Sequence, residues 1–204
     1  MRHTENVVEV RVRQPEPGDA SAVARVHIQA WKVGYHDLLP AKFLAGLNEE
    51  AGAARWAQRL SETKTGNGEP GVEFLVAERR DEAHQLFDLA GIATIGPVRS
   101  SPRETVPTTT IAGIPDGELW MINVRPDAWS SGVGTALLTS AVERLVDRGS
   151  TSPVLWVLRD NDRARRFYEA NGWVADGVTK TDEIGGEMVD EVRYRYRGAD
   201  TPQA

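Results

Sequence analysis

Hydrophobic residues follow a strand-like period at the start of the chain and a helix-like period soon after it. Residues 8–13 alternate apolar and charged side chains, which predicts a half-buried first strand. After Pro17-Gly18-Asp19 the apolar residues recur three and four positions apart, so we expect a helix that ends at Gly34. The apolar stripe of this helix contains Val23, Val26, His27, Ala30 and Trp31. A second stripe predicts a further helix and contains Ala53, Trp56, Ala57 and Leu60.

The rest of the chain predicts a sheet with two more helices. Strands are expected at residues 72–78, 86–95, 118–124, 154–158, 172–178 and 189–196, with the Gly185-Gly186 pair as the last turn. One helix should follow residue 132, and a shorter one should cover residues 161–170. No repeat or second domain is visible. We therefore expect one domain over residues 1–204, with an ordered core at about 7–197 and a frayed tail at 198–204.

Residues 97–117 are rich in Ser, Pro and Thr and show no helical period. A loop of this length within a compact domain is either functional or disordered. We interpret it as a mobile insertion, and a role in shaping a substrate site is the alternative, since the loop directly precedes the strand that begins at residue 118.

Composition limits the class of protein. With 204 residues and 40% hydrophobic residues, the chain is long enough to bury a core of its own. It has no cysteine, which excludes a disulfide framework and a thiol nucleophile, and its side-chain spacing indicates no metal site. A net charge of −6 argues against a nucleic-acid partner. No apolar run is long enough to span a membrane, and residues 1–6 lack the hydrophobic core of a signal peptide, so we expect a cytoplasmic protein.

A loop of small residues at 129–135 connects an apolar strand to an amphipathic helix. Such a loop points unpaired backbone N–H groups and the positive end of the helix dipole at one place, which favours a phosphate ligand. A P-loop is excluded because the chain has no Gly-Lys pair. A dinucleotide loop needs Gly or Ala where this chain has Leu137, so hydride transfer is not expected. The loop alone is equally compatible with a simple strand-to-helix connection.

Two segments in this region resemble a known family. Val124-Arg125-Pro126 followed by Trp129-Ser130-Ser131-Gly132-Val133-Gly134 is similar to the acetyl-CoA motif of the GNAT superfamily, Val-x-Pro followed by Gln/Arg-x-x-Gly-x-Gly/Ala. Trp129 is the departure, because an indole supplies no charge where the family has Gln or Arg. The second segment matches the family pattern Asn-x-x-Ala-x-x-Phe-Tyr-x-x-x-Gly-Phe, with Trp for the last Phe. It contains Asn161, Ala164, Phe167, Tyr168, Gly172 and Trp173. A third string, Ala30-Trp31…Tyr35…Leu38-Leu39-Pro40, is similar to many bacterial members.

The resemblance implies an α/β (α+β) fold in a single GNAT domain. Its mixed, mostly antiparallel sheet should have about 6–7 strands, split at a V, with about 4 flanking helices. Acetyl-CoA, the acyl donor, would enter the split. The residues expected to bind it are Ile122, Asn123, Val124, Trp129, Ser130, Ser131, Gly132, Val133, Gly134, Thr135, Asn161, Arg163 and Tyr168.

The resemblance also implies direct transfer from the donor to an amine in a ternary complex, which agrees with the absent cysteine. Tyr168 would then protonate the departing sulfur. Glu118 is the candidate base, because in a regular strand it shares a face with Trp120 and Ile122, although a solvated strand end is equally compatible. His27 is more often a core residue on such an apolar stripe. The acceptor site is expected to contain Trp31, Tyr35, His36 and Trp120.

We therefore expect an acetyl-CoA-dependent N-acetyltransferase that acts on the primary amine of a small molecule. One alternative is a non-catalytic acyl-CoA-binding GNAT domain that acts as a sensor or regulator. Another is a protein or peptide N-acetyltransferase. No nucleic-acid or membrane partner is expected, a homodimer stays open, and the sequence does not identify the acceptor.

Overall fold

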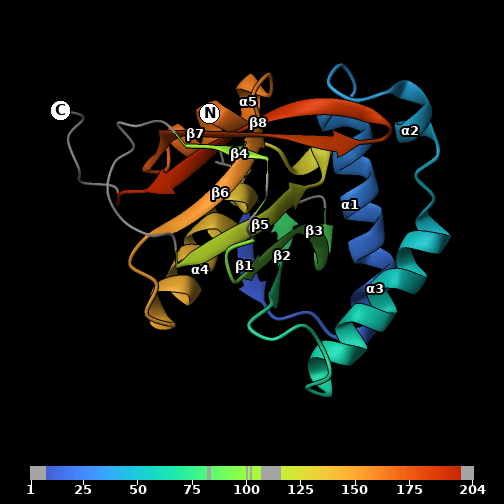
Figure 1. Cartoon of the computed structure of the whole chain (residues 1–204). Helices are drawn as coiled ribbons and strands as arrows, with labels where there is room; N and C mark the ends of the chain where they lie inside the picture. The colour runs from blue at the N-terminus through green and yellow to red at the C-terminus, as the bar shows by residue number, and fades with distance from the viewer. Residues whose placement is uncertain (1–7, 82–83, 100, 102, 107–115, 199–204) are drawn as a thin grey trace, which may run out of the picture.

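The computed structural model describes residues 8–81, 84–99, 101, 103–106 and 116–198, which form one mixed sheet with helices on both of its faces (Figure 1). The strands are β1 Glu9–Arg13, β2 Glu73–Asp81, β3 His84–Gly96, β4 Glu104–Thr105, β5 Gly117–Val124, β6 Pro153–Leu158, β7 Trp173–Ile184 and β8 Glu187–Tyr196. The α-helices are α1 Ala20–Gly34, α2 Ala41–Ala45, α3 Glu49–Lys64, α4 Val133–Asp147 and α5 Asp162–Glu169.

The strand order across the sheet is β1-β2-β3-β5-β6-β8-β7-β4. Only the β5–β6 pair is parallel among these neighbours, so the expected fold class is confirmed. The described residues form 8 strands, where about 6–7 were expected. The additional strand is β4, which pairs with β7 and lies in the segment 97–117 that was expected to be a loop. The expected tail lies outside the described residues, apart from Gly198.

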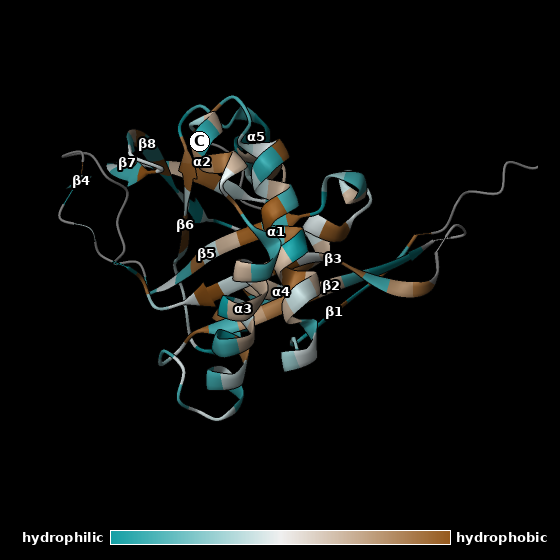
Figure 2. Cartoon of the chain, turned by 90° about the vertical axis from the view of Figure 1, so that its right-hand side faces the viewer, coloured by the Kyte–Doolittle hydropathy of each residue, from teal (hydrophilic) through white to brown (hydrophobic). Residues whose placement is uncertain are grey.

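Two hydrophobic cores cover the two faces of the sheet, because successive side chains of a strand point to opposite sides. In β2, Leu75 and Ala77 pack with α4, whereas Phe74 and Val76 pack with α1 and α3. Figure 2 shows α1 and α3 side by side on one side of the molecule. Because each core is tied to a different helix layer, the sheet between them is held in a fixed position.

The sheet divides between β5 and β6. These strands pair only from Gly117 to Leu119, opposite Pro153 to Leu155. Beyond that point β5 stays with β3 and β6 stays with β8. The edge of β5 from residue 120 to residue 124 therefore has no neighbouring strand on the β6 side, which is the V that the resemblance implied.

Asp116 fixes the closed end of this V. Its carboxylate accepts hydrogen bonds from the Ser150 hydroxyl at 2.5 Å and from the backbone N–H groups of Thr151 and Ser152 at 2.7 and 2.9 Å. Desolvation raises the pKa of Asp116, but these hydrogen bonds outweigh it and lower the pKa to about 2. The start of β5 is thereby held against the turn that leads into β6.

Candidate active site

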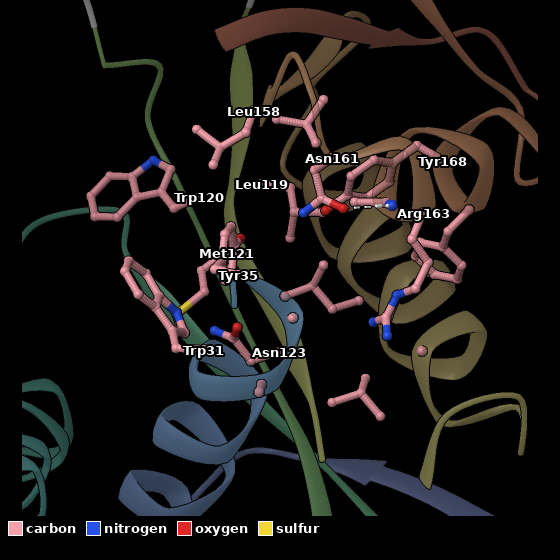
Figure 3. Close-up of a pocket in the computed structure, with 18 of the residues that line it drawn as sticks. Trp31, Tyr35, Leu119, Trp120, Met121, Asn123, Leu158, Asn161, Arg163 and Tyr168 are labelled. Atoms are coloured by element: carbon pink, nitrogen blue, oxygen red, sulfur yellow. Dashed lines mark hydrogen bonds between the residues drawn. The ribbon is translucent and has the colours of Figure 1, made fainter. Parts of the chain in front are cut away.

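A cavity of about 610 Å³ occupies the V between β5 and β6. It runs from the loop before α4, past α5, to α1 and the end of β3. Figure 3 shows Trp31 and Trp120 on one side of β5, and Asn161, Arg163 and Tyr168 on the other. Most of the expected site residues line this cavity, namely Trp31, Tyr35, Trp120, Ile122, Asn123, Val124, Trp129, Ser130, Gly132, Gly134, Thr135, Asn161, Arg163 and Tyr168.

The loop before α4 exposes a run of backbone donors. Within the part of the chain that the structure describes, no acceptor pairs with the six N–H groups of residues 130–135, and the first internal bond is Ala136 N–H to the Gly132 carbonyl. Ser130 and Gly132 have φ angles of 61° and 85°, and such left-handed residues turn successive N–H groups toward one point. Gly134 keeps the loop close to α5, since an added Cβ would lie 3.3 Å from the Phe167 ring. This arrangement suits an anion such as a diphosphate.

Ser131 and Val133 are the two loop residues whose side chains do not line the cavity. Val133 is fully buried in the core under α4. The Ser131 hydroxyl donates to the Ala128 carbonyl at 2.7 Å. Any contact of these two residues with a phosphate therefore has to come from their backbone N–H groups.

Trp129 carries no charge, but its ring packs against the charged side chain of Arg163. The Arg163 guanidinium lies 3.2 Å from the centroid of the indole ring, and the indole N–H donates to the Val124 carbonyl at 2.8 Å. Burial lowers the pKa of Arg163, and no described carboxylate forms an ion pair with it. Two other arginines of the motif segments are already neutralised, because Arg125 pairs with Asp88 and Arg159 pairs with Asp190. Arg163 therefore lies against the loop without an ion-pair partner among the described residues.

Tyr168 presents a buried phenol to the cavity. The residue is 7% exposed, and no described residue forms a hydrogen bond with its hydroxyl. Burial, with a smaller contribution from nearby Tyr35, raises its pKa above the ordinary value of about 10, so the proton stays on the oxygen at neutral pH. Asn161 caps α5, and its side-chain oxygen accepts the Ala164 N–H at 3.1 Å. The amide nitrogen of Asn161 remains as a donor at the cavity wall.

Glu118 does not face the cavity as the regular strand pattern predicted. A β-bulge between Thr94 and Ile95 places one extra residue, Trp120, in β5 and reverses the alternation of its faces. Leu119 consequently packs on the same face as Ile122, and Glu118 is fully buried on the other. Its carboxylate accepts the Arg99 backbone N–H at 2.8 Å and the Arg99 side chain at 2.9 and 2.5 Å. The prediction that Glu118 points into the cleft is wrong.

His36 is also outside the cavity. Its side chain is 77% exposed, and Nδ1 lies 2.9 Å from the Asp37 carboxylate. The prediction that it belongs to the acceptor site is therefore not supported by its position. His27, expected to be a core residue, packs against Trp31 and Trp56 and lies 3.3 Å from the Asn123 amide nitrogen.

Sequence reasoning missed several residues of the cavity wall. They come from four strands, from the segment after β3 and from α3, and no spacing in the chain relates them to each other. They are Arg59, Thr94, Arg99, Leu158, Trp156, Ile184 and Glu191. Glu191 is the ionisable carboxylate of the described cavity wall, and Lys180 pairs with it at 2.9 Å.

Comparisons with known proteins agree with this geometry. The sequence model of the Acetyltransferase (GNAT) family matches residues 34–173. The chain is 30% identical over 184 residues to the N-acetyltransferase YuaI of Bacillus subtilis, and the match covers 90% of each chain. It is also 30% identical to a mycothiol acetyltransferase of Parafrankia, covering 80% of this chain but only 54% of that protein. The chain therefore belongs to the GNAT family of acetyltransferases and is an acyltransferase.

The fold comparison points the same way. The structure of a PaiA N-acetyltransferase from Thermoplasma acidophilum in complex with coenzyme A superposes with a TM-score of 0.61. The two sequences are 17% identical, and the superposition covers 98% of that chain and 90% of this one. No helix in the described part of the chain has the length and apolar character needed to cross a membrane.

Proposed function

We propose that the protein transfers an acetyl group from acetyl-CoA to the primary amine of a small molecule. The observation that carries this proposal is the continuous path in one cavity from the free N–H groups of residues 130–135, along the unpaired edge of β5, to the Tyr168 phenol. A diphosphate, an extended amide-containing arm and a thioester need these three environments in this order.

Each part of the path has a role that its chemistry supports. The loop N–H groups and Arg163 would hold the diphosphate, and the edge of β5 at residues 122–124 would pair with the amide groups of the pantetheine arm. A free N–H at this edge would also polarise the thioester carbonyl. Acetyl-CoA supplies the thioester, whose C–S bond breaks as the amine nitrogen forms its bond to the carbonyl carbon.

Two protons move in this reaction. Tyr168 would give its phenolic proton to the departing sulfur, and its raised pKa ensures that the proton is present at neutral pH. The attacking amine loses a proton, and Glu191 replaces Glu118 as the candidate acceptor because its carboxylate lines the cavity. Burial, followed by the charge of Glu191, raises the pKa of Tyr35 to about 12, so this phenol also keeps its proton at neutral pH. The Tyr168 oxygen then takes a proton back from solvent, and Glu191 releases the amine proton to solvent.

An experiment on the purified protein tests the proposal. Calorimetric titration with coenzyme A measures binding, and thiol release from acetyl-CoA measures transfer to a panel of amines, peptides and aminoglycosides. We expect both. Coenzyme A binding without turnover on any member would instead favour the sensor, and turnover on peptides alone would favour a peptide N-acetyltransferase. If coenzyme A does not bind, both the proposed cofactor site and the proposed transfer reaction are wrong.

A further inference from the structure

The end of the cavity next to α1 and β3 contains polar atoms without partners. The Thr94 hydroxyl and the Trp31 indole N–H are buried and make no hydrogen bond to any described residue. Thr94 is 2% exposed, and both residues line the cavity. Buried polar groups in native proteins are nearly always hydrogen-bonded. Both residues belong to the cavity wall, and each of these groups can donate a hydrogen bond to an oxygen acceptor.

One arginine of α3 lies at the same end of the cavity, and a second lies in a pocket beside it. Arg59 lines the main cavity and also an adjoining pocket of about 170 Å³, which Arg55 shares. Arg55 and Arg59 are one helical turn apart, where like charges repel each other. Among the residues that the structure describes, no carboxylate lies within ion-pairing distance of either guanidinium. Arg59 instead lies 5.0 Å from the Trp56 ring centroid, which leaves its N–H groups available.

The other charges near this end cancel. Arg99 is paired with the buried Glu118, and Glu191 is paired with Lys180. His27 adds no charge at neutral pH, because burial and then the fields of Arg59 and Arg55 lower its pKa to about 4. The uncompensated charge at this end of the cavity is therefore positive.

We propose that the acceptor is an amine that also carries an anionic group, and that Arg59, assisted by Arg55, binds this group at the end of the cavity lined by Thr94 and Trp31. A guanidinium binds a carboxylate or a phosphate through two parallel hydrogen bonds, and the hydroxyl and indole groups can bond a further oxygen. The aromatic rings of Trp31, Tyr35 and Trp120 fit an apolar body between the anion and the amine. This inference rests on the proposed transfer to an amine, whose nature it narrows to an acid.

Matched pairs of amines test the inference. L-phenylalanine is compared with L-phenylalaninamide, and O-phosphoethanolamine with ethanolamine, as acceptors of acetyl groups from acetyl-CoA. Within each pair the change removes the anion and leaves the amine. We expect at least one acid to have kcat/KM about tenfold or more above its neutral partner, as loss of a hydrogen-bonded charge predicts. The pair in which the acid is the better acceptor shows whether the site binds a carboxylate or a phosphate.

Variants of α3 connect the preference to the proposed residue. Arg59→Gln should raise KM for the preferred acid by about tenfold or more and should raise KM for the neutral partner by much less. Lys64→Gln removes an exposed charge from the last turn of the same helix, away from the cavity, and should change neither value. Equal or better use of the neutral partners, or a preferred acid whose KM does not respond to Arg59→Gln, would overturn the inference.

Failure of the proposed function gives a different result. If no amine is acetylated although coenzyme A binds, the transfer activity is rejected. Calorimetric binding of the four amines to the protein saturated with coenzyme A then decides the inference by itself. Binding of an acid that Arg59→Gln abolishes supports the anion site, and no acid binding refutes it.

Discussion

Arg163 stacks on the ring of Trp129 at 3.2 Å from its centroid, and these residues come from α5 and from the loop before α4. The family pattern has Gln or Arg at the position of Trp129. In this chain the charge comes instead from the neighbouring helix, and the indole holds it over the loop. The substitution that looked like a lost phosphate contact is thus accompanied by a cation from another element.

We expect Trp129→Ala to weaken coenzyme A binding by about two- to thirtyfold, because a cation–π contact is worth about 0.5–2 kcal/mol. Trp129→Phe keeps a ring under the guanidinium and should lose less. Calorimetry on Trp129→Ala, Arg163→Gln and the double variant measures the coupling. Additive losses in the double variant would show that the stack does not position Arg163.

Tyr168→Phe removes the phenolic proton and keeps the ring that packs against Trp173. We expect kcat to fall by about 100-fold or more, the range of general acid catalysis, while the dissociation constant of coenzyme A stays within about twofold. Steady-state rates and calorimetry on the same preparation measure the two values. An unchanged kcat would remove Tyr168 from the chemistry.

The two ends of α4 offer a matched pair of glycines. Gly132 and Gly149 have φ angles of 85° and 87°, and an added Cβ would meet nothing within 4 Å at either position. Alanine at either site should therefore lower the free energy of unfolding by a similar amount, about 1–2 kcal/mol, through backbone strain alone. Only Gly132→Ala alters the loop N–H groups, so only this variant should weaken coenzyme A binding. Equal affinity in both variants would argue against the loop as the diphosphate site.

Protonation of His27 should couple stability to pH. Its pKa is lowered from 6.5 to about 4, so between these values the unfolded chain binds a proton that the folded protein does not. The free energy of unfolding should consequently rise from pH 4 to pH 6.5, by at most about 3 kcal/mol. His27→Gln should flatten this part of the profile in urea titrations. A slope that persists in the variant would have to come from another group.

Glu118→Gln tests the corrected role of this residue. The buried carboxylate accepts three hydrogen bonds from Arg99, half of whose side chain is exposed. We expect a loss of about 1–2 kcal/mol in the free energy of unfolding with kcat within about threefold of the parent. Glu191→Gln should show the opposite result, with a lower kcat. A large fall of kcat in Glu118→Gln would restore it as a base.

Local patterns predicted the elements that depend on local physics. Period and punctuation predicted α1 up to Gly34 and the β7–β8 hairpin at Gly185-Gly186, because side-chain spacing and left-handed turns are encoded within a few residues. The orientation of Glu118 could not be predicted in this way. It depends on a bulge, and that bulge exists only in the pairing of β5 with β3.

The cavity wall shows the same division. The loop and the start of α5 carry sequence motifs, and residues of both line the cavity. Arg59, Thr94 and Glu191 carry no such pattern, since they meet only after α3, β3 and β8 have packed together. The roles assigned to individual side chains remain predictions for the variants described above.

Among the described strands, the two halves of the sheet are joined to each other only by the short parallel pairing of β5 with β6 at Gly117–Leu119. Coenzyme A bound between β5 and β6 would connect the two halves of the sheet, because its amide groups would form hydrogen bonds to the part of β5 that has no neighbouring strand. Amide hydrogens of residues 130–135, and those of residues 120–124 that point away from β3, should therefore exchange quickly with deuterium in the free protein and become protected when coenzyme A binds. The hydrogens of β2 and β3, already bonded to each other, should change little by comparison.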